Sequence, residues 1–141
     1  DKLISNIPLI MLSAMPLTLI QCGGHIIQAV GDYEADLKTG VQTFVVRYGR
    51  KRGVILAGSM FLIASLSPFI YSAFGLLPYR HLFLFFMLSP VSMPIIKRYA
   101  DVLKNPSTKN VIGIQKTARK YGIIGVIVIW AYALLARTAR F

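Results

Sequence analysis

The sequence predicts an all-α, polytopic membrane protein, a bundle of about four transmembrane helices. Of its 141 residues, 55% are hydrophobic and only 15% are charged, whereas an ordinary soluble domain has about 25% charged residues. Its 16 Lys and Arg residues outnumber its 5 Asp and Glu residues, which gives a formal net charge of +11. A chain that is both apolar and basic suits a bilayer with an anionic inner surface, so we expect membrane lipid as a partner.

The basic residues gather in short blocks between apolar runs instead of covering a polar face, so nucleic acid is not an expected partner. Cys22 is the sole cysteine, which excludes an internal disulfide and a multi-cysteine zinc site. The chain opens at Asp1 without a methionine or a visible signal peptide, and we expect it to be a piece of a longer protein.

Four apolar segments approach the roughly 20 residues that a membrane-spanning helix needs, and together they form one transmembrane domain over residues 1–141. The first covers residues 7–30 and contains no acidic residue, Lys or Arg. Pro8 and Pro16 lie inside it, where we expect kinks. The second span covers residues 54–77 and is equally free of charged residues.

The third predicted span, residues 82–98, is short, but the basic residues at its end can reach the membrane surface and so lengthen it. The fourth span covers residues 118–137. We expect an amphipathic stretch to continue this helix upstream, beginning near Ser107 or Thr108, since either hydroxyl is suited to cap a helix.

Basic residues alternate between the two sides of the predicted bundle. The connection after the first span carries five Lys and Arg residues, whereas the connection after the second carries one. Residues 97–120, from the end of the third span to the start of the fourth, carry seven. Because cytoplasmic loops are enriched in Lys and Arg, we expect the first and third connections on the cytoplasmic side and both ends of this chain outside.

The first span carries a stripe of polar residues along one helix face. Its members are three or four residues apart and stay within about 80° of arc if the helix continues to Asp36. They are Thr18, Gln21, His25, Gln28, Asp32 and Asp36. Glu34 falls on the opposite side. Since polar groups are costly in hydrocarbon, we expect the stripe to line a cavity open to the cytoplasm, although Gln21 and His25 are also suited to hydrogen bonding between helices.

Asp32 and Asp36 are one helical turn apart, and two carboxylates at this spacing repel each other unless a cation lies nearby. Lys38 and Arg47 are suited to that role, which would make the group a structural ion-pair network. The alternative is Mg²⁺, which binds one or two carboxylates together with substrate phosphate oxygens and water. On the second interpretation the same lysine and arginine would bind the phosphate that the metal carries.

Residues 31–53 are expected to form a cytoplasmic loop. Gly40 and Gly49 are signals for turns or helix ends, and the stretch between them is apolar enough to lie at the membrane surface. This stretch is suited to fold over the carboxylates as a lid. For the basic residues 50–52 we favour a simpler role: they are part of a cytoplasmic connection, and such connections are enriched in Lys and Arg.

The segment DYEADLKTGVQTFVVRYG, residues 32–49, resembles the second aspartate-rich motif of the UbiA superfamily of intramembrane prenyltransferases. The pattern is D-x-x-x-D, then a Lys or Arg, a glycine, a run with Thr or Ser, and Arg-x-Gly. The matching positions are Asp32, Asp36, Lys38, Gly40, Thr43, Arg47 and Gly49. The resemblance is close over residues 28–53 and loose elsewhere, and several coordinated positions are more specific than a bare DxxxD.

The resemblance implies a fold and a reaction. The four spans would be the last four of a nine-helix bundle, and the amino-terminal helices of the same protein, with the first aspartate-rich motif, would be partners outside this chain. The implied reaction is Mg²⁺-dependent transfer of a prenyl group from an allylic isoprenyl diphosphate to a lipophilic acceptor, aromatic or lipid. This chain alone would hold half a metal site and be inactive.

The resemblance also implies roles for individual residues. Asp32 and Asp36 would hold the metal, while Lys38 and Arg47 would bind the diphosphate and neutralise its developing charge. His25 and Gln28 would orient the metal ligands or contact substrate. Two interpretations compete with an enzyme: a transporter or channel subunit whose polar stripe conducts protons or cations, and a scaffold held to anionic lipid by its basic connections.

Overall fold

The computed structural model describes residues 7–138, and within that range the side chains of residues 14–79, 81–84 and 87–135. Every regular element in this part of the chain is helical, which confirms the all-α prediction. The elements are α2 (Ile7–Thr39), α3 (Phe44–Tyr48), α4 (Arg50–Ala73), the short 3₁₀ helix η1 (Tyr79–Leu82), α5 (Phe83–Lys104) and α6 (Thr108–Thr138).

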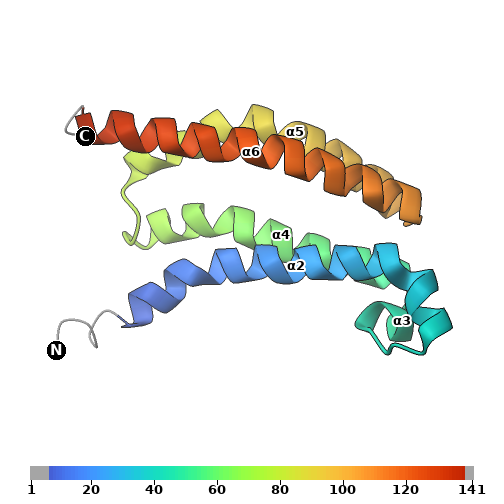
Figure 1. Cartoon of the computed structure of the whole chain (residues 1–141). Coiled ribbons are helices and arrows are strands. Elements are labelled where there is room, and N and C mark those ends of the chain that lie inside the picture. Colours follow the sequence, from blue (N-terminus) through green and yellow to red (C-terminus); the bar gives the residue numbers. More distant parts are fainter. Residues whose placement is uncertain (1–6, 139–141) are drawn as a thin grey trace.

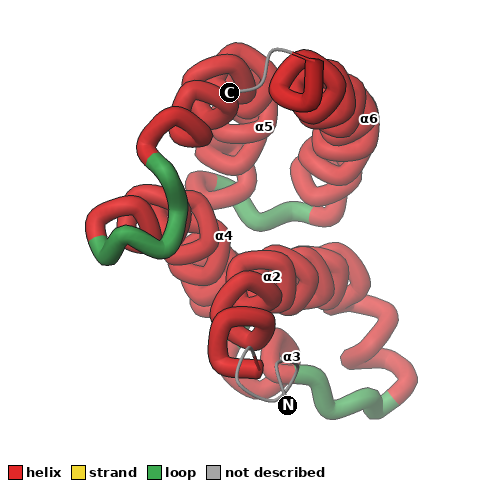
Figure 2. The backbone as a smooth tube through the Cα atoms, turned by 90° about the vertical axis from the view of Figure 1, so that its left-hand side faces the viewer, coloured by secondary structure: helices red, strands yellow, loops and turns green. Residues whose placement is uncertain are grey.

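The four long helices form two antiparallel pairs. α2 packs mainly against α4, and α5 packs mainly against α6. Figure 1 shows the two pairs lying one over the other, and the end-on view in Figure 2 places α4 beside the α5–α6 pair and α3 beneath α2. α3 and the connection between α5 and α6 lie at one end of the bundle, called here the motif end because it includes residues 32–49.

The core is concentrated at the motif end, where five helices meet. Fully or nearly fully buried apolar side chains from each helix contact one another there. They are Ile27 and Val30 of α2, Val45 of α3, Val54 and Ala57 of α4, Val102 of α5, and Val111 and Ile114 of α6. Large apolar side chains along the rest of α4 and α6 are exposed, as expected of helices that meet lipid or further helices.

Two helices, Arg50–Ala73 and residues 108–135 of α6, are long and apolar enough to cross a membrane. They cover most of the second and fourth predicted spans, residues 54–73 and 118–135. The first and third predicted spans fall within α2 and α5, and their passage through a bilayer remains a prediction, as does the side on which the motif end lies.

Two predicted boundaries differ from the structure. Residues 31–53 are largely helical, because α2 continues without a break to Thr39 and α3 and α4 follow closely. α4 ends at Ala73 and does not reach residue 77. The cause is Gly75, whose φ of 70° permits a Schellman turn in which the amide of Leu76 donates to the carbonyl of Tyr71 at 2.8 Å.

The predicted start of α6 agrees with the structure. The helix begins at Thr108, and the hydroxyl of Ser107 accepts a hydrogen bond from the amide of Asn110 at 3.4 Å. Ser107 therefore acts as the cap. Thr108 has a different role, because its hydroxyl donates to the carbonyl of Gly31 in α2 at 3.1 Å.

Close packing at the motif end depends on Gly53. A Cβ atom added there would lie 2.9 Å from Cγ2 of Val45 and 3.1 Å from Cγ2 of Val30. Both distances are shorter than van der Waals contact, so only glycine lets α3 and α2 approach the start of α4 this closely. Gly24 of α2 is a contrast, since its Cβ would meet nothing within 4 Å.

Replacing Gly53 with Leu should therefore lower the free energy of unfolding by about 1–3 kcal/mol, because the larger side chain overpacks the core. Gly122→Leu on α6, where an added Cβ also meets nothing within 4 Å, is the matched control and should be neutral or slightly stabilising. The measurement is denaturant unfolding in detergent micelles followed by circular dichroism. Equal stability of the two variants would contradict the packing described for Gly53.

Candidate functional site

The motif begins on the last two turns of α2 and continues through α3. α2 ends at Thr39, and Gly40 follows with a φ of 73°. The amide of Val41 donates to the carbonyl of Asp36 at 3.0 Å, which completes a Schellman turn and reverses the chain. Gly40 is therefore a helix-ending glycine, as the sequence predicted.

α3 is held by a cap at one end and by a buried valine in the middle. The hydroxyl of Thr43 accepts a hydrogen bond from the amide of Val46 at 3.2 Å, so Thr43 is the N-cap. Val45 is fully buried and approaches Gly53 and Val30. Gly49 then separates α3 from α4 with φ 89° and ψ 153°, a conformation that only glycine adopts without strain.

Arg50 connects three helices at the motif end. Its Nη2 lies 3.3 Å from Oε1 of Glu34 and 3.5 Å from the hydroxyl of Thr108, and its guanidinium lies 4.6 Å from the ring centroid of Tyr33. The Glu34 side chain is 64% exposed, so the ion pair alone contributes no more than about 1 kcal/mol. The cation–π contact adds to the attraction between α4 and α2, and the hydroxyl of Thr108 brings the start of α6 to the same guanidinium.

This role of Arg50 was not predicted from the sequence, where residues 50–52 are expected to form a basic connection. Its partners lie in α2 and at the start of α6, and Thr108 is 58 residues away in the chain. The pairing follows from helix packing and leaves no local pattern in the sequence. Placing Glu34 away from the two aspartates was correct as helix geometry, and Arg50 is the group that Glu34 contacts instead.

Asp32, Asp36, Lys38 and Arg47 have no such partners among the residues that the structure describes. Asp32, Lys38 and Arg47 are exposed, and Asp36 is half-buried. Among the described residues the ion pairs are Glu34–Arg50 and Arg98–Asp101, so neither aspartate is paired with Lys38 or Arg47. The Arg47 guanidinium lies over the ring of the neighbouring Tyr48, 5.4 Å from its centroid. The ion-pair network considered from the sequence is therefore not formed within this part of the chain.

The helix geometry nevertheless brings the two aspartates together. α2 is continuous to Thr39, so Asp32 and Asp36 lie on the same side of it, one turn apart. Within residues 7–138, no group of three or more His, Cys, Asp and Glu side chains is arranged to hold a metal ion. Two carboxylates on one helix can supply part of a Mg²⁺ coordination shell, and phosphate oxygens, water or further carboxylates would have to complete it.

The polar stripe of α2 faces away from the other helices of this chain. Gln21, His25, Gln28 and Asp32 are exposed, while the buried residues Gly23, Ile27 and Val30 lie on the opposite side of the helix. No side-chain hydrogen bond joins Gln21 or His25 to another helix in the described part of the chain. The expected cavity is therefore not enclosed by these four long helices, and any cavity along the stripe would need a wall from elsewhere.

The cap on α3 generates a prediction. Thr43→Ala removes the acceptor for the amide of Val46 and should destabilise α3 locally by about 1 kcal/mol. Thr43→Ser keeps the hydroxyl and is the matched control. Hydrogen exchange of the amides in residues 44–48, read by mass spectrometry, measures the effect: it should be faster in the alanine variant only. Unchanged protection in both variants would show that the cap is not needed.

Comparison with protein-family models, curated proteins and solved structures gives no match for this chain. The resemblance to the UbiA superfamily accordingly depends on residues 28–53 and on the order of their chemistry. The motif positions divide into two groups in the structure. Gly40, Thr43 and Gly49 shape the backbone, whereas the aspartates, Lys38 and Arg47 project charge without neutralising one another.

Proposed function

We propose that this chain is part of a Mg²⁺-dependent prenyltransferase that moves a prenyl group from an allylic isoprenyl diphosphate to a lipophilic acceptor in a membrane. The observation that carries the proposal is the division of the motif just described. The glycines and Thr43 each have a structural reason, but Asp32, Asp36, Lys38 and Arg47 have none within the described residues. A binding role gives these four charges a reason.

The donor chemistry fits Mg²⁺. Carboxylate oxygens are ligands that this hard cation prefers, and it is usually bound by one or two carboxylates together with substrate phosphates. Asp32 and Asp36 supply two carboxylates from one side of a regular helix, and they are accessible to a ligand. When bound, the metal supplies positive charge that stabilises the diphosphate as it departs.

The remaining residues have defined tasks in this scheme. Lys38 and Arg47 are exposed cations that follow the aspartates in sequence. They would bind diphosphate oxygens and offset the negative charge that grows as the carbon–oxygen bond breaks. His25 and Gln28, on the same face of α2, would orient the aspartates or contact the acceptor. Apolar helix surfaces would surround the prenyl chain and exclude water from the carbocation.

The exposed polar stripe supports the presence of further helices. A face with Gln21, His25, Gln28 and Asp32 is expensive against lipid, because polar side chains in hydrocarbon normally face a bundle interior or a wet cavity. We infer that additional helices cover this face and contribute the other metal ligands, so that the active site lies between them and α2. The motif end would then be cytoplasmic, as the basic residues predict.

The first test removes one carboxylate charge at a time. Asp32→Asn and Asp36→Asn should each lower prenyl transfer by about a hundredfold or more, because the metal loses a ligand and the leaving group its counter-charge. Glu34→Gln is the matched control, since Glu34 lies on the same helix but contacts Arg50. The assay uses the whole gene product in membranes, a radiolabelled allylic diphosphate and a panel of acceptors, with Mg²⁺ or with a chelator.

Transfer that survives chelation, or survives both aspartate substitutions, would contradict the proposal. Metal-independent ion flux through vesicles that contain the protein, abolished by the same aspartate variants, would favour the transporter or channel instead. Loss of activity in Glu34→Gln to the same extent would show that the effect is not specific to the two aspartates, and it would remove this support for metal binding.

The second test addresses the two cations. Lys38→Gln and Arg47→Gln should each raise the KM for the diphosphate and lower kcat, with kcat/KM reduced about tenfold or more, because charge-assisted hydrogen bonds to phosphate are lost. Lys109→Gln, an exposed lysine in the first turn of α6, is the control and should leave both constants unchanged. A kcat/KM unaffected by either motif substitution would exclude these residues from the site.

A further inference from the structure

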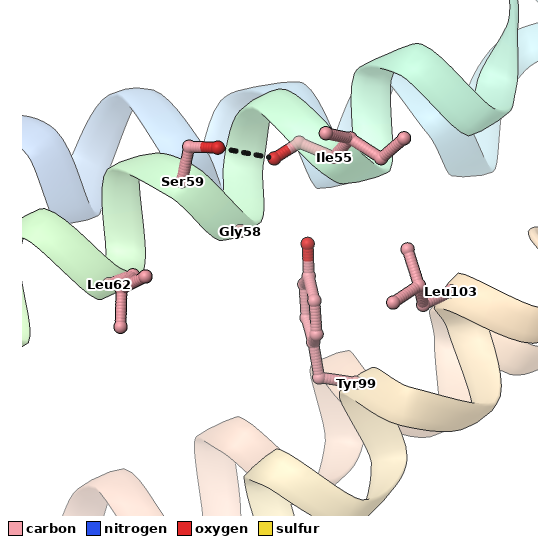
Figure 3. Close-up of a pocket in the computed structure, with 6 residues that line it drawn as sticks. All are labelled: Ile55, Gly58, Ser59, Leu62, Tyr99 and Leu103. Carbon is pink, nitrogen blue, oxygen red and sulfur yellow. Dashed lines mark hydrogen bonds between the residues drawn. The ribbon is translucent and has the colours of Figure 1, made fainter.

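An open groove lies between α4 and α5, away from the polar stripe of α2. It has a volume of about 290 Å³ and is lined by Ile55, Gly58, Ser59, Leu62, Tyr99 and Leu103. Figure 3 shows Tyr99 reaching from α5 toward α4 at Gly58, with Leu62 on one side of its ring and Leu103 on the other. The groove is therefore a gap between the two helix pairs that Tyr99 only partly fills.

The polar groups in the groove are already satisfied. The hydroxyl of Ser59 donates to the carbonyl of Ile55 at 3.1 Å, and the hydroxyl of Tyr99 donates to the carbonyl of Val54. Ile55, Leu62 and Leu103 remain 50%, 60% and 42% exposed. The wall thus offers apolar surface and no free hydrogen-bonding side chain, which suits a hydrocarbon chain better than a polar ligand.

The stripe of α4 that lines the groove continues to a lysine one turn beyond it. Lys51, Ile55, Gly58 and Leu62 are four, three and four residues apart in α4, so they form one stripe along the helix. Lys51 and its neighbour Arg52 are exposed, and the first turn of α4 contains no acidic residue. The Lys51 side chain is thus placed to reach the end of an apolar groove at the level where a charged residue meets the membrane surface.

We propose that this groove binds the acyl chain of an anionic glycerophospholipid, with the phosphate of its headgroup at Lys51 and Arg52. The apolar wall accounts for the chain, and the two cations account for the negative headgroup. The lipid would lie against both helix pairs at once, beside the contact between Tyr99 and α4. This inference requires α4 to be in a membrane and does not depend on prenyl transfer.

The test uses two photoreactive lipids as probes, a phosphatidylglycerol and a phosphatidylcholine that each carry a diazirine in one acyl chain. The whole protein is placed in phosphatidylcholine vesicles that contain one probe, irradiated, and mapped by peptide mass spectrometry. We expect phosphatidylglycerol to label residues 55–62 and 99–103 severalfold more strongly than phosphatidylcholine does. Equal labelling by the two probes would overturn the charge selectivity that defines the site.

Two substitutions locate the lipid. Ser59→Phe fills the groove and should abolish most of this labelling. Ser65→Phe is the matched control, because Ser65 is also an exposed serine of α4 whose hydroxyl donates to the carbonyl four residues earlier, at 2.8 Å, yet it lies outside the groove. Labelling that persists in Ser59→Phe, or falls equally in both variants, would contradict the proposal.

A third substitution tests the headgroup and leaves the helix packing intact. Lys51→Gln should reduce the preference for phosphatidylglycerol by about fivefold, and Lys116→Gln, an exposed lysine of α6, should not change it. If an added isoprenyl diphosphate displaces the probe from wild-type protein, the groove belongs to the substrate and the lipid assignment is wrong. Labelling that is insensitive to the diphosphate supports it, whatever the outcome of the transfer assay.

Discussion

The packing of Val45 and Val30 around Gly53 is the constraint on which the motif end depends. Val45 is the buried residue of a five-residue helix, so this one side chain anchors α3 to both α2 and α4. Gly53 permits the approach because a larger residue would overlap Val45 and Val30. Because α3 is held in this way, residues 40–49 keep a fixed position relative to the end of α2. Arg47 of α3 therefore stays close to the helix that contains Asp32 and Asp36.

Much of the fold was predictable from local chemistry. The four long helices follow from apolar length, and Ser107, Gly40 and Gly49 marked ends or caps that the structure contains. The end of α4 at Gly75 was not predicted, because this glycine lies within an apolar run that is typical of one continuous membrane span. Residues 31–39 were predicted as loop because charge begins there, but good helix formers such as Ala35, Leu37 and Lys38 continue α2.

Those parts of the candidate site were predictable that depend only on the spacing of residues along one helix. The common face of Asp32 and Asp36 requires only that α2 continue past them, and it does. The partners of Arg50 were not predictable, because its contacts join Glu34 and Thr108 from separate helices. The sequence also could not predict which way the polar stripe faces. Amphipathic spacing defines a helix face, but only the packing of α4 decides which face is covered, and α4 covers the face opposite the stripe.

The arrangement as two antiparallel pairs has a consequence for biogenesis. The two helices of each pair are close in the chain, since residues 105–107 join α5 to α6 and residues 40–49, which include α3, join α2 to α4. Their contacts are therefore local in sequence and form early. On the predicted four-span topology, each pair would enter a bilayer as a helical hairpin while synthesis continues. The two pairs can then associate fully only after α6 has formed, because Val111 and Ile114 of α6 complete the shared core. The hydrogen bond from Thr108 to the carbonyl of Gly31 forms at the same stage.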